Sequence, residues 1–89
     1  MAEKDFSKLL YSAVMTLETE EECKHLFEDL CTPKEIKSIA QRFAVAKMLS
    51  EGRIYNDIVK EPGASTATIS RVNRTMSKGS RTVLERLKD

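Results

Sequence analysis

Two helical patterns separated by a sharp break constrain the fold of this 89-residue chain more than any other feature, and both lie within residues 55–76. The first pattern is short and centres on Ile58, and residues 62–65, Pro-Gly-Ala-Ser, then interrupt it. Glycine tolerates the positive φ that a tight turn between two helices requires. The second pattern repeats apolar residues at helical spacing on one face, namely Ile69, Val72 and Met76. This arrangement predicts a helix-turn-helix over residues 54–77.

The outward face of the second helix carries small and cationic side chains, which is typical of a helix that enters the major groove of DNA. Ser65 or Thr66 is expected to cap this helix by accepting a hydrogen bond from its free N–H groups. We expect Thr66, Ala67 and Ser70 to face base edges, and we also place Ser65 and Thr68 in the interface. Phosphate contacts are expected from the cations Lys60, Arg71, Arg74 and Lys78. The alternative is an ordinary corner between two helices with a solvated basic face.

The charges of the chain are unevenly distributed, although its formal net charge is only +1. Residues 1–31 carry eight acidic and three basic side chains, a net of −5, whereas residues 32–89 carry twelve basic and six acidic ones, a net of +6. Residues 66–81 include four cationic side chains and no acidic one. A cationic patch attracts phosphates and releases counterions. We therefore expect the acidic part to point away from DNA, with a solvated charged surface as the alternative.

The other segments also have helical patterns, which predicts an all-α fold of six short helices. Thr19 and Glu22 form the pattern of a capping box. Residues 32–35, Thr-Pro-Lys-Glu, are the clearest helix start, because they combine a cap, a proline at the first helical position and a glutamate that can reach back. That helix is expected to end at Gly52. Residues 78–80, Lys-Gly-Ser, are expected to end one helix and cap the last one.

The whole chain, residues 1–89, is expected to form a single domain. Residues 1–52 would supply dimerisation helices, residues 54–77 the helix-turn-helix and residues 80–89 the C-terminal helix. A chain this short buries a small core, so association into a homodimer would cover apolar faces that a monomer leaves open. The charged start lacks the apolar segment of a signal peptide, and no apolar run is long enough to span a bilayer. We expect a soluble, cytoplasmic protein without membrane contact.

Other chemistry has little support in the sequence. Cys23, His25 and Cys31 lack the spacing of a four-ligand zinc site, so we predict no metal. We interpret the two cysteines as buried thiols and the histidine as a surface or interface residue. The sequence contains no glycine-rich phosphate loop, nucleophile elbow or paired carboxylates. We therefore predict no catalytic residues and no enzymatic activity.

Several segments resemble the Trp repressor superfamily. Residues 30–35, Leu-Cys-Thr-Pro-Lys-Glu, look like the LLTPDE entry into that family's long third helix, and residues 63–71, GASTATISR, are similar to its GAGIATITR run. Arg42 and Gly52 fall where the family has an arginine and a closing glycine. The clear match covers about residues 30–76, roughly half of the chain. The resemblance implies transcriptional repression by an intertwined all-helical homodimer, whose two reading heads enter successive major grooves.

The resemblance also implies a site for a small corepressor. The two arginines that hold the ring and carboxylate of tryptophan in the Trp repressor match Arg42 and Arg71, and a serine beside the ligand's amino group matches Thr75. Guanidinium groups stack on aromatic rings and bind carboxylates through two bonds. Val72, however, replaces a glycine beside the ligand, so we expect L-tryptophan to bind weakly or not at all. The alternatives are an ion pair for Arg42 and a phosphate contact for Arg71, with no cofactor.

Two classes of function follow from these observations. The first is a sequence-specific DNA-binding transcriptional repressor that acts as a homodimer, with or without control by a small ligand. The second is a protein-interaction module whose helix-turn-helix faces another protein. A related variant is a duplex DNA reader like that of a replication initiator, a domain that normally belongs to a longer chain with an ATPase. A self-contained chain with apolar N-terminal helices favours the repressor.

Overall fold

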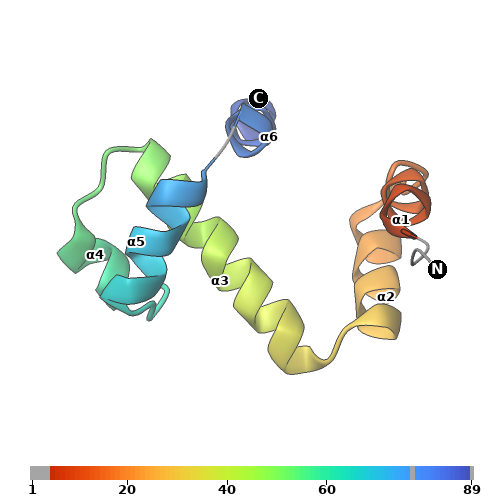
Figure 1. Ribbon diagram of the computed structural model, residues 1–89, viewed down its shortest axis with the longest axis horizontal. Helices are drawn as coiled ribbons and strands as arrows, with labels where there is room; N and C mark the ends of the chain where they lie inside the picture. Colours follow the sequence, from red (N-terminus) through yellow and green to blue (C-terminus); the bar gives the residue numbers. More distant parts are fainter. Residues whose placement is uncertain (1–4, 77, 89) are drawn as a thin grey trace. The chain divides into compact units, whose positions relative to one another are not determined.

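The computed structural model describes residues 5–76 and 78–88, the side chain of Lys78 excepted, and contains six α-helices and no strand in these residues (Figure 1). The predicted all-α fold is therefore confirmed. The internal contacts divide the chain into two units, Met1–Ile36 and Lys37–Asp89, so that the division falls inside the third helix. The helices are α1 (Ser7–Val14), α2 (Glu20–Leu30), α3 (Pro33–Ser50), α4 (Tyr55–Lys60), α5 (Thr66–Thr75) and α6 (Lys78–Leu87).

The helices α1 and α2 belong to the first unit, and neither contains a buried residue. Thr19 caps α2 as predicted, because its Oγ1 accepts a hydrogen bond of 3.1 Å from the Glu22 N–H. The reciprocal half of the predicted capping box is wrong. The Glu22 carboxylate accepts instead from the Glu18 N–H, at 2.8 Å, so its backbone partner is the residue before the cap.

The long helix α3 begins and ends at the predicted signals. The Thr32 N–H donates to the Glu35 carboxylate at 2.8 Å, and the Glu35 N–H donates to Thr32 Oγ1 at 3.1 Å, which completes a reciprocal capping box. At the other end, Gly52 has a φ of +77°. Its N–H donates to the Leu49 carbonyl at 3.0 Å, and the next N–H, that of Arg53, donates to Met48 at 3.1 Å. These two bonds form the Schellman arrangement that terminates helices at glycine.

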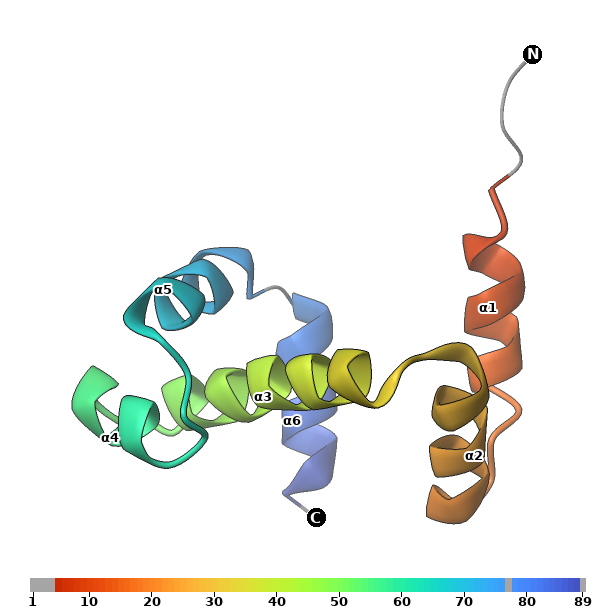
Figure 2. The same cartoon turned by 90° about the horizontal axis from the view of Figure 1, so that it is seen from below.

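A small apolar core holds α3, α4 and α5 together in the second unit. Val45, Ile58 and Ile69 have no exposed surface, and each comes from a different one of these helices. In Figures 1 and 2, α4 and α5 lie beside the C-terminal half of α3. The rest of the buried cluster consists of Ala46, Ala64 and Val72, with Met48, Leu49, Val59 and Met76 packed against it. The apolar face predicted for the second helix of the helix-turn-helix therefore faces the core.

The turn between α4 and α5 has the predicted glycine conformation. Gly63 has a φ of +73°, and the next residue, Ala64, is buried in the core with 2% of its surface exposed. Ser65 caps α5, because its Oγ accepts from the Thr68 N–H at 3.2 Å. Thr66 is the first residue of the helix, so of the two predicted caps Ser65 is the one that forms. The turn thus fixes where α5 begins.

The predicted break at residues 78–80 is wrong. The helix α6 begins at Lys78, so Gly79 and Ser80 lie inside it, and α6 ends at Leu87. The reason is that α5 stops earlier, at Thr75, where the Met76 backbone turns to an extended conformation (φ −60°, ψ 123°). Glycine in the interior of a helix is destabilising because of its backbone freedom. In the first turn of a helix the destabilisation is smaller.

Replacing Gly63 with alanine is expected to lower the free energy of unfolding by about 1 kcal/mol, because a Cβ is disfavoured at positive φ even where space is open. An added Cβ at this position would meet no heavy atom within 4 Å, so the strain is conformational. The measurement is chemical denaturation followed by circular dichroism. Gly79→Ala in helical backbone is the matched control and should be neutral or stabilising. Equal destabilisation by both substitutions would contradict this account of the turn.

Candidate nucleic-acid interface

The outward face of α5 has the exposure that was predicted for a DNA-reading helix. Thr66, Ala67 and Ser70 are exposed, and so are the two arginines Arg71 and Arg74. These five residues come from the first two and a half turns of a ten-residue helix, whose opposite side is buried. The arrangement places small side chains at the tip of the helix and guanidinium groups along its flank, which is the surface that a major groove accommodates.

The cap residues are placed differently from the rest of this surface. Ser65 is exposed, and its hydroxyl donates to Thr68 Oγ1 at 3.1 Å. Thr68 is half-buried; its Oγ1 accepts that bond, and its N–H donates to Ser65 Oγ at 3.2 Å. The first N–H groups of α5 carry the positive end of the helix dipole, which favours a phosphate nearby. These two residues therefore organise the start of α5.

The turn before α5 contributes one predicted cation and one acidic residue. Lys60 is exposed at the end of α4, as expected for a phosphate contact. The next residue, Glu61, forms an ion pair of 2.8 Å with Arg53, which follows α3. The arginine thus compensates the acidic charge closest to Lys60 in the chain. The side chain of Lys78, the remaining predicted contact, lies outside the described residues.

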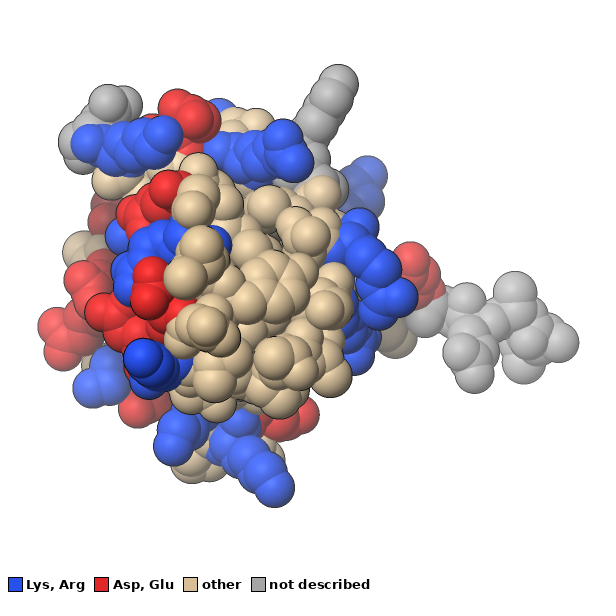
Figure 3. All heavy atoms as spheres, turned by 90° about the vertical axis from the view of Figure 1, so that its left-hand side faces the viewer, with Lys and Arg blue, Asp and Glu red and all other residues tan. Residues whose placement is uncertain are grey.

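Figure 3 shows the face of the second unit on which α4 lies, which is the left-hand side of Figure 1. Lysine and arginine side chains surround an area of uncharged side chains, and acidic side chains gather toward one side of the view. An uncharged area bordered by cations is compatible with a surface that meets both bases and phosphates. This pattern agrees with the excess of basic residues in the C-terminal part of the sequence.

A hollow of about 350 Å³ lies beside α5, where the resemblance placed a corepressor. Arg42 and Thr75, two of the three predicted effector residues, line it, but Arg71 is not among its lining residues. The Thr75 hydroxyl donates to the Arg71 carbonyl at 3.0 Å, and the Arg42 Nε donates to the Ser38 carbonyl at 3.5 Å. The lining residues are Ile39, Arg42, Phe43, Ala46, Val72, Thr75, Met76 and Ser80.

Val72 separates this hollow from the interior of the second unit. Its side chain is only 8% exposed, so it belongs to the core and at the same time forms part of the wall of the hollow. The side chain of a valine occupies space that a glycine would leave open. Val72 and Arg42 thus line the same hollow, and the predicted exclusion of L-tryptophan stays a prediction.

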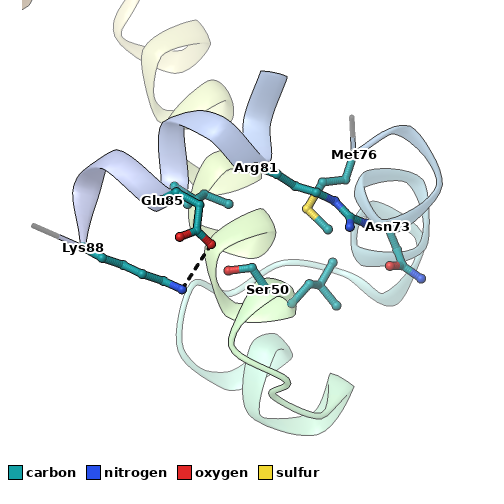
Figure 4. A pocket seen from close by; sticks show the side chains of 8 residues that line it. Ser50, Asn73, Met76, Arg81, Glu85 and Lys88 are labelled. Carbon is teal, nitrogen blue, oxygen red and sulfur yellow. Dashed lines mark hydrogen bonds and ion pairs between the residues drawn. The ribbon is translucent and has the colours of Figure 1, made fainter. Parts of the chain in front are cut away.

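A second hollow, which sequence reasoning missed, lies between α3, α5 and α6 and has a volume of about 390 Å³ (Figure 4). Leu49, Met76 and Leu84 supply apolar lining, and Leu84 is buried. Glu85 and Lys88 form an ion pair of 3.4 Å at this hollow. Its polar lining is completed by Ser50, Asn73 and Arg81. No sequence signal marks this hollow, because residues from three separate helices contribute to it.

The cysteines and the histidine do not assemble into a site. Cys23 and Cys31 are free thiols and half-buried, so the prediction that they are buried is wrong for a single chain. Cys23 lies in α2 and Cys31 directly follows it, and α2 contains no buried residue at all, which explains the difference. His25 is exposed. Within residues 5–76 and 78–88, no group of three or more His, Cys, Asp or Glu side chains could hold a metal ion.

The six helices, the glycine turn and the capped, cationic α5 define a helix-turn-helix protein of the all-α class. The family model for the Trp repressor protein matches residues 6–89, and the chain belongs to the Trp repressor family. This family is typically non-enzymatic. No helix in the part of the chain that the structure describes has both the length and the apolar character needed to cross a membrane.

Similar proteins come from several bacteria. A TrpR-like protein from Eubacterium eligens has a solved structure that is 50% identical to this chain, with a TM-score of 0.86 over 91% of this chain and 87% of that one. A candidate Trp repressor from Staphylococcus aureus is 43% identical, with a TM-score of 0.84 over 97% and 96% of the two chains. The uncharacterised protein YerC of Bacillus subtilis is 53% identical over 70 residues, which are 79% of this chain and 67% of that protein.

Proposed function

We propose that this protein is a sequence-specific DNA-binding transcriptional repressor that acts as a homodimer. One observation carries the proposal, namely the outward face of α5, where small exposed side chains lie beside two exposed arginines. Membership of the Trp repressor family supports the same function. An exposed basic face alone would suit many partners. A capped helix with small residues at its tip, supported by a glycine turn, favours the major groove of DNA.

The side chains of this surface have different roles in the proposal. Thr66, Ala67 and Ser70 face base edges, because short side chains let the helix approach the groove closely and bind bases directly or through water. Cations on the flanks bind phosphates, which fixes the register of the protein on the duplex. These cations are Lys60, Arg71, Arg74 and Lys78.

Selection of bound duplexes from a random DNA pool tests the proposal most directly. A repressor of this kind should enrich a sequence with twofold symmetry, since each subunit of a homodimer reads one half-site. Half-sites about one helical turn apart are expected, because two successive major grooves would be occupied. Recovery of a pool no different from the starting one, at low salt and with all measured protein folded, would contradict sequence-specific binding.

Arg74→Ala is expected to weaken binding to all duplexes alike and to reduce the slope of log K against log salt by about 1, because one phosphate contact is lost. Fluorescence anisotropy at several salt concentrations measures both quantities. Arg86→Ala removes the same charge from the last turn of α6, outside the proposed surface, and is the matched control. A changed sequence preference with an unchanged salt slope would show that Arg74 reads bases instead.

The proposed homodimer is supported by apolar surface that the single chain leaves open. On the first helix and beside it, Phe6, Leu9, Tyr11 and Met15 are 67%, 69%, 66% and 83% exposed. Neither α1 nor α2 has a buried residue. Water-exposed apolar surface of this extent is a typical mark of an interface. We therefore propose that a second copy covers these helices.

Sedimentation of the full chain at micromolar concentration should give about twice the chain mass of 10.1 kDa. Leu9→Glu should shift the protein toward the monomer and lower its thermal stability, since a buried interface cannot accept an unpaired carboxylate cheaply. Lys8→Glu, next to it on α1, is the charged control and should leave the mass unchanged. A well-folded monomer at all concentrations would overturn the dimer.

Control by a small ligand is a further part of the proposal, with the ligand placed in the hollow beside Arg42. The guanidinium of Arg42 and the hydroxyl of Thr75 are polar groups of that lining, and apolar side chains supply much of the rest. Such a site suits a small carboxylate with an apolar body. Val72 limits the size of that body, and Arg71 stays with the phosphate contacts.

Calorimetric titration with L-tryptophan should show binding weaker than micromolar or none, because Val72 occupies space beside Arg42. The DNA affinity of the protein should then be the same in the absence and in the presence of tryptophan. Val72→Ala enlarges the hollow and should bind tryptophan better than the unchanged protein, at some cost in stability. Micromolar binding that is lost in Arg71→Ala and that tightens DNA affinity would restore a tryptophan-dependent mechanism.

A further inference from the structure

The turn of the helix-turn-helix is fastened to the long helix by one side-chain hydrogen bond. Gln41, on α3, donates through Nε2 to the carbonyl of Pro62 at 3.1 Å. The two residues are 21 positions apart in the chain, whereas the capping bonds at the helix starts join residues three apart. Both Gln41 and Pro62 are half-buried. This bond therefore joins α3 to the turn between α4 and α5, two elements of the second unit that are distant in the sequence.

The location of the bond gives it influence over α5. Pro62 immediately precedes Gly63, whose φ of +73° sets the direction of the turn, and only Ala64 then separates Gly63 from the cap Ser65. Ala64 is buried in the core, so the turn is held on one side by apolar packing. Gln41 holds it at the preceding carbonyl. The two contacts together fix where the first turn of α5 lies on α3.

A second tie to the same turn differs in kind. Arg53, in the segment after α3, forms an ion pair with Glu61, which directly follows α4. The Glu61 side chain is 59% exposed. Exposed ion pairs contribute little and are screened by salt. The half-buried amide bond is much less sensitive to salt, and removal of its donor would leave the Pro62 carbonyl without that partner.

We infer that Gln41 is a positioning residue that sets the angle of the reading helix through the Pro62 carbonyl. The inference rests on the proposed DNA-binding function. Gln41 itself touches no DNA in this scheme; it holds the turn from which Ser65 and Thr66 begin α5. Loss of the bond widens the range of positions that α5 occupies. DNA binding must then restrict α5 to one position, and the entropy cost of that restriction lowers the affinity.

Gln41→Met tests this role, because methionine keeps the size and the helix propensity of glutamine but has no N–H donor. The affinity for the selected duplex should fall about three- to tenfold, the effect of one lost neutral hydrogen bond, while the salt slope stays unchanged because no phosphate contact is removed. Gln41→Asn, which keeps the amide but is one methylene too short, should lose as much. Ser38→Met, an exposed position on the same helix, is the matched control and should keep full affinity.

Nuclear magnetic resonance provides a readout that does not depend on DNA. Gln41 is the single glutamine of the chain, so its side-chain NH₂ resonances are identified by their loss in Gln41→Met. In the unchanged protein one of these protons should exchange slowly with solvent. In both Gln41 variants the backbone amides of Gly63 and Ala64 should shift and exchange faster, while those of Gly52 should not. Ser38→Met should leave all of them in place.

The outcomes separate the inference from the proposed function. Unchanged DNA affinity in both Gln41 variants, or unchanged amides at Gly63 and Ala64, would overturn the positioning role. A loss of thermal stability with full DNA affinity of the folded protein would also overturn it, because a merely structural residue would behave in that way. If the unchanged protein selects no duplex, the proposed function fails, and the amide measurements alone then decide whether Gln41 holds the turn.

Discussion

The packing of α4 and α5 against the C-terminal half of α3 is the interaction on which the exposed face of α5, the proposed DNA-reading surface, depends. Val45, Ile58 and Ile69 are each without exposed surface and belong to one cluster. Burial of an aliphatic side chain of this size contributes roughly 1.5–3 kcal/mol. Because the helical period places residues 69 and 72 on one side, burial of that side turns Ser70, Arg71 and Arg74 outward. Exposure of this face of α5 is thus a consequence of core packing.

Signals that involve neighbouring residues predicted the start and the end of α3 and the turn before α5. The cap at residue 32 with its proline, the closing Gly52 and the turn glycine Gly63 each depend on backbone geometry within four residues, and all three have the predicted form. The failure at residues 78–80 has a related cause. Glycine and serine after a lysine are compatible with either a break or the first turn of a helix. The earlier end of α5, at Thr75, decided in favour of the helix.

Contacts between distant residues could not be predicted in the same way. The bond from Gln41 to Pro62 and the ion pair between Arg53 and Glu61 depend on how α4 returns along α3, which no local pattern specifies. The hollow shown in Figure 4 combines three helices for the same reason. The exposed apolar residues of α1 illustrate the converse case. The predicted helix forms there, but the local pattern does not specify a partner for its apolar side chains, and the second copy that covers them is a proposal.

The core and the hollow beside Arg42 share residues, and this gives any ligand there a physical route to the packing of α5. Ala46, Val72 and Met76 all belong to or pack against the core cluster, and all three line the hollow. Val72 lies in the C-terminal half of α5, and Met76 directly follows this helix. An occupant that pressed on Val72 would therefore act on the packing that holds α5. A ligand changes the equilibrium between arrangements of α5 only by its differential affinity for them. Val72 already fills part of the space and belongs to the core, so under the proposed function the core packing itself would order α5, and DNA binding would need no ligand.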